Sequence, residues 1–346
     1  MGKARVTLMY SAKQTDQAIT LLNKALSLDP GLSEARMDLV KIYISTNEPD
    51  TALTWLEDYL TYAPDTADVE WTRAMILLEK GDADGALAAV DRARELDRSY
   101  LPSYLLWSKI LQQMGRYEES IVPALTYLNG VPGNSEGGLL LAKAYYNTGD
   151  VPLALSTIDK VISADKKVID AYLLRGDIYM DLGDLIEADN DYLRAQQLYY
   201  RSFGALIGRA RVQLAYTYAG AAYNYILSAE DAVTTPREQA ILLYWRAQAL
   251  IGLKENGAAI RDYEALLALP EGIAPEDLLE KARTEYFAMV TTTPTFTPTI
   301  TYTPSPTFTA SPTLTPSRTA TVTRTPTITR TPTPSETPSP TFTATK

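Results

Sequence analysis

The sequence contains no cysteine and no histidine among its 346 residues. Without Cys there is no disulfide and no thiolate metal ligand, so cysteine usage says nothing about the redox compartment. Without His the commonest general base is missing, and so is the usual partner of a nucleophilic Ser. No convergent set of acid, base and nucleophile can be named. We therefore expect no enzymatic activity, no metal site and no cofactor.

Long apolar runs and an excess of positive charge are lacking as well. No stretch of about 18 apolar residues is present, so we expect no membrane-spanning segment. The net charge is −10. The residues after 290 carry four cations and one carboxylate, so the preceding part carries about −13. Such an acidic body lacks the basic face that nucleic acid requires, and we expect no nucleic-acid partner.

The composition changes abruptly near residue 290. From Thr291 to Lys346, Thr alternates with Pro, Ser, Arg and single apolar residues. Dense Pro argues against a strand, and the composition is typical of an extended, disordered tail or linker. The tail resembles the Thr/Pro-rich linkers of bacterial cell-envelope proteins. That resemblance implies an extracytoplasmic or envelope-associated protein, with a cytoplasmic location as the alternative.

The rest of the chain shows an internal repeat. Small residues recur every 34 positions at Ala18, Ala52, Ala86, Ser120, Ala154, Ala188 and Ala222. The next equivalent, Ala259, requires a three-residue insertion, for which Thr234-Thr235-Pro236 is the natural place. A fixed period of this length indicates an array of small structural repeats.

Further columns keep the same spacing. A second set of mostly small residues lies twelve positions earlier, at Val6, Val40, Ala74, Ser108, Ala142, Gly176, Ala210 and Ala247. Paired small residues let two helices pack closely. Glycines at 81, 115, 149 and 183 fit the end of a first helix, and prolines at 30, 64 and 132 fit the end of a second. This spacing predicts two helices of about 12–14 residues per repeat.

Several segments resemble the tetratricopeptide repeat. They include Ala171-Tyr172-Leu173-Leu174-Arg175-Gly176-Asp177-Ile178-Tyr179, followed by Gly183-Asp184 and Ala188, and Gly115-Arg116-Tyr117-Glu118-Glu119-Ser120. The resemblance implies an all-α, right-handed superhelical solenoid of about eight helix-turn-helix repeats over residues 1–270. Residues 271–290 are expected to form a closing helix with a polar outer face of Asp277, Glu280, Lys281, Arg283 and Glu285. Since the first repeat begins almost at residue 1, one interpretation is a fragment of a longer array.

The resemblance also implies a binding groove, because in this family the first helix of each repeat lines the concave surface. The family register places Met37, Trp71, Leu105, Leu139, Leu173, Ile207 and Tyr244 in one column of that groove. A second column holds Lys41, Met75, Lys109, Lys143, Asp177, Arg211 and Gln248. A third holds Ile44, Leu78, Gln112, Tyr146, Met180, Leu214 and Ile251.

These columns predict a protein-interaction scaffold. Apolar anchors flanked by Lys41, Lys109, Lys143 and Arg211 suit a protein or peptide segment with acidic groups. Two alternatives stay open: the cations pair with nearby carboxylates such as Asp38 and Asp177, and part of the apolar column belongs to the core. An alternative function is the sensory or regulatory part of a larger signalling protein. The oligomeric state stays open.

Acidic motifs do not change this interpretation. Asp82-Ala83-Asp84-Gly85 resembles part of a calcium loop, but Lys80 stands at its first ligand position. The cluster Asp181, Asp184, Glu187, Asp189 and Asp191 is interpreted as a solvated acidic surface. Asp29, Asp97 and Asp165 recur near the ends of second helices and are interpreted as turn residues.

Overall fold

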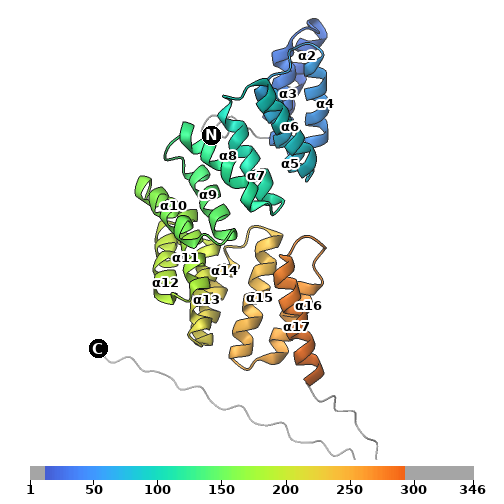
Figure 1. The fold of residues 1–346 in the computed structure, drawn as a ribbon. Helices are drawn as coiled ribbons and strands as arrows, with labels where there is room; N and C mark the ends of the chain where they lie inside the picture. Colours follow the sequence, from blue (N-terminus) through green and yellow to red (C-terminus); the bar gives the residue numbers. More distant parts are fainter. Residues whose placement is uncertain (1–11, 293–346) are drawn as a thin grey trace, which may run out of the picture. The chain divides into compact units, whose positions relative to one another are not determined.

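The computed structural model describes residues 12–292, and this stretch forms sixteen helices and no strand (Figure 1). The first helices of successive repeats are α3 (Ser33–Ser45), α5 (Ala67–Glu79), α7 (Leu101–Gln113), α9 (Ser135–Asn147), α11 (Ile169–Leu182), α13 (Phe203–Ala215) and α15 (Pro236–Gly252). The second helices are α4 (Pro49–Leu60), α6 (Ala83–Leu96), α8 (Tyr117–Gly130), α10 (Val151–Ala164), α12 (Leu185–Leu198), α14 (Ala219–Glu230) and α16 (Asn256–Leu267). Before them lies α2 (Ala12–Leu28), and after them α17 (Glu276–Thr292). The predicted all-α helical repeat solenoid is confirmed.

Two predicted features lie outside the described residues. They are the first helix of the first repeat, expected within residues 1–11, and the Thr/Pro-rich tail beyond residue 292. The second helix of that first repeat is α2, which contains Ala18. The structure therefore describes seven complete helix pairs of the array.

The predicted insertion lengthens one helix. The paired helices have 12 to 14 residues, except α15, which has 17. Thr235 is the N-cap of α15 and Pro236 is its first residue. Proline suits that position because its missing N–H would have no partner within the helix. The extra residues thus add about one turn to the start of α15.

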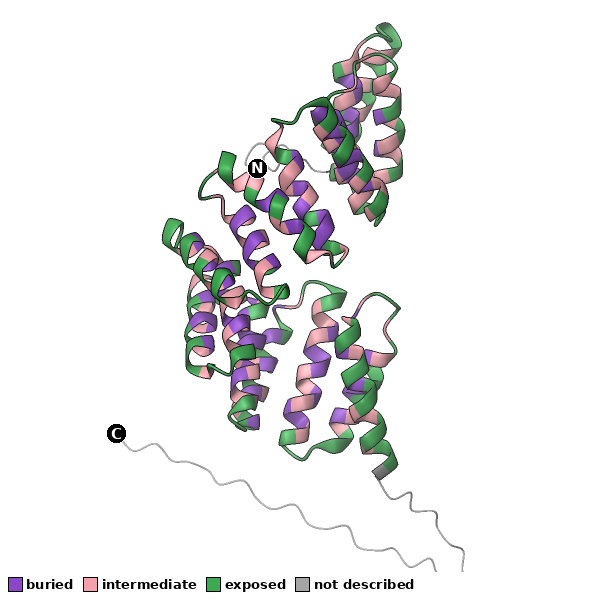
Figure 2. Cartoon of the chain, in the orientation of Figure 1, coloured by how far each residue is buried: buried purple, intermediate pink, exposed green. Residues whose placement is uncertain are grey.

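The two small-residue columns bring the paired helices together. From residue 52 on, every small residue of the second-helix column is fully buried: Ala52, Ala86, Ser120, Ala154, Ala188, Ala222 and Ala259. At Gly176 a Cβ atom would lie 2.8 Å from the Tyr192 ring, so only glycine leaves room for this tyrosine. Buried positions follow the faces along which neighbouring helices pack (Figure 2).

The glycine column has the predicted conformation. Gly81, Gly115, Gly149 and Gly183 all have a positive φ, between 74° and 86°. In each of these turns nothing lies within 4 Å of the position that a Cβ would occupy. Glycine is therefore favoured here by its backbone freedom and not by a lack of space.

Aspartates end several second helices by forming turns. Asp29, Asp97 and Asp165 each accept a hydrogen bond from the backbone N–H two residues later, at 2.8–2.9 Å. This is the local bond by which Asp favours turns over helices. The interpretation of these residues as turn residues is confirmed.

The helices form two layers. From α5 to α15 each first helix contacts the first helix of the next repeat, whereas second helices of neighbouring repeats make at most marginal contact within residues 12–292. In a curved stack, the elements on the inner side lie closer together than those on the outer side. The first helices, which contact one another, therefore form the inner face. The residues of the predicted groove columns therefore belong to the inner layer.

The last helix takes the place of another first helix. α17 packs against both α15 and α16. Asp277, Glu280, Lys281 and Arg283 are exposed, as expected of a polar end. The prediction is wrong for Glu285, whose carboxylate accepts hydrogen bonds from side chains of α15 and α16.

Candidate binding site on the first helices

The apolar groove column is partly surface and partly core. Met37, Trp71, Leu105, Leu139 and Leu173 are partly exposed on α3 to α11. Ile207 on α13 and Tyr244 on α15 are buried in hydrophobic clusters. The alternative that some of this column belongs to the core therefore holds at its C-terminal end. Apolar anchoring positions remain available from α3 to α11.

The lysines of the second column are exposed and free. Lys41 lies on α3, Lys109 on α7 and Lys143 on α9. None of their ammonium groups forms an ion pair or hydrogen bond with another described residue. The expected alternative, pairing with a carboxylate such as Asp38, does not occur for these three lysines.

Arg211, by contrast, belongs to an internal network. Its guanidinium forms an ion pair with Asp177 at 2.5 Å and lies 5.5 Å from the ring centre of Trp245. The Tyr192 hydroxyl donates to the same Asp177 oxygen at 2.7 Å. Burial, and then the Asp177 carboxylate, raise the pKa of Tyr192 far above its ordinary value. Pairing with Asp177 was one of the two interpretations of this arginine, and it is the one that the structure shows.

Two further sets of hydrogen bonds join helices in this part of the array. The Tyr146 hydroxyl on α9 donates to Asp181 on α11. Burial, together with this hydrogen bond, raises the pKa of Tyr146 to about 12. On α17, Glu285 accepts hydrogen bonds from Tyr244, Gln248 and Tyr263. On the inner face, the side chains of Asp177, Arg211, Tyr244, Gln248 and Glu285 thus hydrogen-bond within the chain.

One contact on the inner layer was missed at the level of sequence. Tyr100, in the loop before α7, packs edge-on against Trp71 with ring centres 6.5 Å apart. Its hydroxyl donates to Asp68 on α5 at 2.7 Å. Tyr100 lies outside the three groove columns, and a loop residue carries no helical periodicity that could have revealed it.

The acidic motifs have structural roles. Asp82 caps α6 by accepting from the Gly85 N–H at 2.8 Å, which is the bond of an N-cap. The interpretation of the cluster as a solvated surface holds for Asp184 and Glu187, which are exposed. It is wrong for Asp191, which is buried and forms an ion pair with an arginine of α11, and Asp189 pairs with an arginine of α13. Among residues 12–292, no group of three or more Asp, Glu, His or Cys side chains is placed to hold a metal ion.

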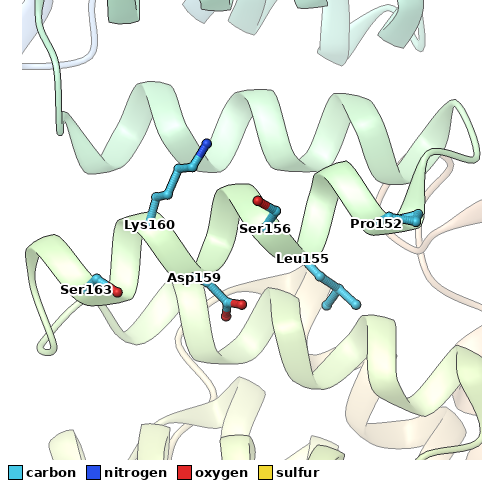
Figure 3. A pocket seen from close by; sticks show the side chains of 6 residues that line it. All are labelled: Pro152, Leu155, Ser156, Asp159, Lys160 and Ser163. Atoms are coloured by element: carbon cyan, nitrogen blue, oxygen red, sulfur yellow. The ribbon is translucent and has the colours of Figure 1, made fainter.

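A hollow on the second helices offers no comparable chemistry. It follows one side of α10 and is lined by Pro152, Leu155, Ser156, Asp159, Lys160 and Ser163 (Figure 3). Asp159 is engaged with Arg175 at 2.6 Å. The inner face of the first helices therefore remains the better candidate site.

Comparison with known proteins agrees with the repeat analysis. Residues 9–75 and residues 169–200 each match a family profile of the tetratricopeptide repeat. A comparison with curated protein sequences found no match. No helix within residues 12–292 has the length and hydropathy needed to span a membrane.

Solved structures share the fold at low sequence identity. A tetratricopeptide repeat protein from Parabacteroides merdae is 16% identical with a TM-score of 0.61, over 72% of this chain and 98% of that one. Yeast Tom70 is 15% identical with a TM-score of 0.59, over 81% of this chain and 59% of Tom70. A chain of the APC/C hetero-tetramer Cut9–Hcn1 is 15% identical with a TM-score of 0.57, over 78% of this chain and 52% of that one. The repeat spacing, the paired helices and these matches together identify the chain as a tetratricopeptide repeat protein.

Proposed function

We propose that the chain is a protein-interaction scaffold that binds an acidic, apolar-anchored protein segment on the inner face of α5, α7 and α9, without catalysing a reaction. Proteins of this repeat family generally mediate protein–protein interactions. The observation that carries the proposal is the pair Lys109 and Lys143. These are exposed, unpaired cations on neighbouring inner helices.

The position of these lysines distinguishes them. Lys160 and Lys166 are also exposed and without an ion pair to a described residue, but they lie on or after a second helix. Lys109 and Lys143 lie on two successive first helices. Their helices contact one another, and packed helices lie about 8–10 Å apart. Two acidic side chains of one bound segment can span that distance.

Apolar positions lie beside both lysines. Leu105 precedes Lys109 by one helical turn on α7, and Leu139 precedes Lys143 in the same way on α9. Both leucines are only partly buried. This alternation of apolar and cationic positions suits a segment with apolar anchors between acidic residues.

The C-terminal part of the inner face is a poorer candidate. There Arg211 is paired with Asp177, and Glu285 accepts several hydrogen bonds. A ligand would have to displace these internal contacts before it gained its own. We therefore place the ligand on α5, α7 and α9.

Binding of synthetic peptides to the full chain tests the proposal. The probe is a fluorescent peptide with Leu anchors separated by Glu, compared with the same peptide carrying Lys in place of Glu. We expect the Glu peptide to bind more tightly. The double variant Lys109→Glu/Lys143→Glu is expected to lower its affinity about tenfold or more, because attraction becomes repulsion.

The control reverses two exposed lysines elsewhere. Lys160 lies on α10 and Lys166 follows it in the next loop, and neither forms an ion pair with a described residue. Lys160→Glu/Lys166→Glu changes the net charge by the same amount and should leave the affinity within about twofold. Equal losses in both double variants, or equal binding of the two peptides, would contradict the inner-face site.

A further inference from the structure

A second surface lies at the turns between first and second helices in the C-terminal repeats. Leu182, Tyr216 and Leu253 end successive first helices at equivalent repeat positions and are 51%, 40% and 40% exposed. Beside them Ile186 is 70% and Tyr218 is 62% exposed. We call these five residues the turn edge.

The turn edge is specific to these repeats. At the position of Leu182, earlier repeats have Thr46, Lys80, Met114 and Thr148, of which Met114 alone is apolar and is partly buried. Single exposed apolar residues are normal on a soluble protein, whereas a row of them indicates an interaction surface. The exposed apolar side chains at this position in the C-terminal repeats therefore indicate a binding partner.

The turns follow one another along the layer of first helices. The helices α11, α13 and α15 contact each other in order. At Gly252, next to Leu253, a Cβ atom would lie 2.6 Å from the Cβ of Ala219, next to Tyr218. The rings of Tyr216 and Tyr218 are stacked, with centres 6.1 Å apart and an angle of 30°. The turns after α13 and α15 thus lie against each other, and α11 packs beside α13.

Polar groups on this surface lack partners. The hydroxyls of Tyr216 and Tyr218 form no hydrogen bond with another described residue. Asp184, Glu187 and Glu255 are exposed and belong to no ion pair within the described stretch. The turn segments 181–187, 215–219 and 252–256 contain one cation, Lys254, so their net charge is negative.

The spacing of the row suits a polyproline II helix. Neighbouring packed helices lie about 8–10 Å apart. A polyproline II helix advances about 3.1 Å per residue with three residues per turn, so every third residue returns to the same side after about 9.3 Å. In a β-strand, residues three apart point to opposite faces and do not fit such a row.

The free hydroxyls favour the same ligand. A polyproline II segment has no internal hydrogen bonds, so its carbonyl oxygens can accept from Tyr216 and Tyr218. In an α-helix those carbonyls are already engaged. Aromatic surfaces also stack on proline rings in the known recognition of proline-rich segments.

We propose that the turn edge binds a proline-rich segment in the polyproline II conformation that carries basic residues. Prolines would pack on the two tyrosines and the aliphatic side chains. The basic residues would face Asp184, Glu187 and Glu255. This site is separate from the inner-face lysines and does not depend on them.

Calorimetric titration of the full chain with four defined peptides tests this site. The probes are four repeats each of Pro-Pro-Arg, Pro-Pro-Glu, Gly-Gly-Arg and Gly-Gly-Glu. We expect Pro-Pro-Arg to bind at least tenfold more tightly than each of the others. Equal binding of Gly-Gly-Arg would overturn the proposal in favour of charge attraction alone, and no binding of Pro-Pro-Arg would overturn it as well.

Two double variants localise the binding. Tyr216→Ala/Tyr218→Ala should weaken Pro-Pro-Arg binding at least tenfold. The matched control is Tyr199→Ala/Tyr200→Ala, an exposed pair in the loop before α13 with ring centres 6.2 Å apart. The control should bind as the parent does, and an equal loss in both variants would overturn the site. Lys109→Glu/Lys143→Glu should leave Pro-Pro-Arg binding unchanged. Each of the two proposed sites can therefore be refuted without refuting the other.

Discussion

At the scale of single residues, the turn after each first helix gives the sharpest prediction. Asn47, Thr217 and Lys254 occupy the position held by glycine in the other described repeats, with φ between 60° and 65°. A β-branched residue is rare in this region, and the conformation costs about 1–2 kcal/mol. We expect Thr217→Gly to raise the free energy of unfolding by about 1 kcal/mol, because glycine removes this strain and loses only some chain entropy.

Urea unfolding followed by circular dichroism measures this change. The opposite substitution serves as control: Gly115 has φ of 74° and open space around its Cβ position. Gly115→Ala should therefore lower the stability by about 1 kcal/mol through backbone strain alone. A destabilised Thr217→Gly variant would show that the Thr217 side chain contributes more than its conformation costs.

At the scale of one element, α15 begins with a capping box. Glu238 accepts hydrogen bonds from Thr234 and from the Thr235 N–H, while the Thr235 hydroxyl accepts from the Glu238 N–H. Burial would raise the pKa of Glu238, but these hydrogen bonds outweigh it and lower the pKa below its ordinary 4.5. The carboxylate thus stabilises the fold above pH 4.5, and this contribution is lost as the pH falls through the lowered pKa.

We expect Thr235→Ala to cost about 1 kcal/mol at neutral pH. Glu238→Gln should flatten the change in stability between pH 5 and pH 3 relative to the parent, as measured by thermal unfolding at each pH. The matched control is Glu280→Gln on α17, an exposed glutamate with no hydrogen bond or ion pair from its side chain to a described residue. A pH profile flattened equally by both substitutions would assign the effect to net charge instead of the cap.

The sequence predicts elements better than it predicts contacts between them. The 34-residue spacing located the helix pairs, because Ala52 and its equivalents must be small wherever two helices cross. It also placed Gly81 and its equivalents at the turns. It left open whether Arg211 is free, since the answer depends on Asp177 from the preceding repeat and on Tyr192 from a second helix. Such partners are set by packing across repeats, which periodicity within one repeat does not reveal.

At the scale of the whole molecule, the array is a stack in which repeats contact mainly their neighbours. Stability in such a stack is approximately a sum of local terms. Its inner face divides into a part with free lysines, on α3 to α9, and a part closed by internal polar contacts, on α11 to α17. The envelope location implied by the tail composition stays a prediction, as the tail lies outside the described residues.

This division predicts that a substitution on α17 destabilises only the helices next to it. Glu285→Ala removes the acceptor shared by Tyr244, Gln248 and Tyr263, and the loss of a partner for partly buried polar groups costs about 1–3 kcal/mol. We expect faster hydrogen exchange in α15, α16 and α17, with exchange in α3 to α9 and binding of the acidic peptide both unchanged. Faster exchange throughout the chain would show that the array unfolds as one unit, and weaker peptide binding would extend the ligand site to α17. Only the local result is consistent with a structural role for the C-terminal inner face and a binding role for the lysines.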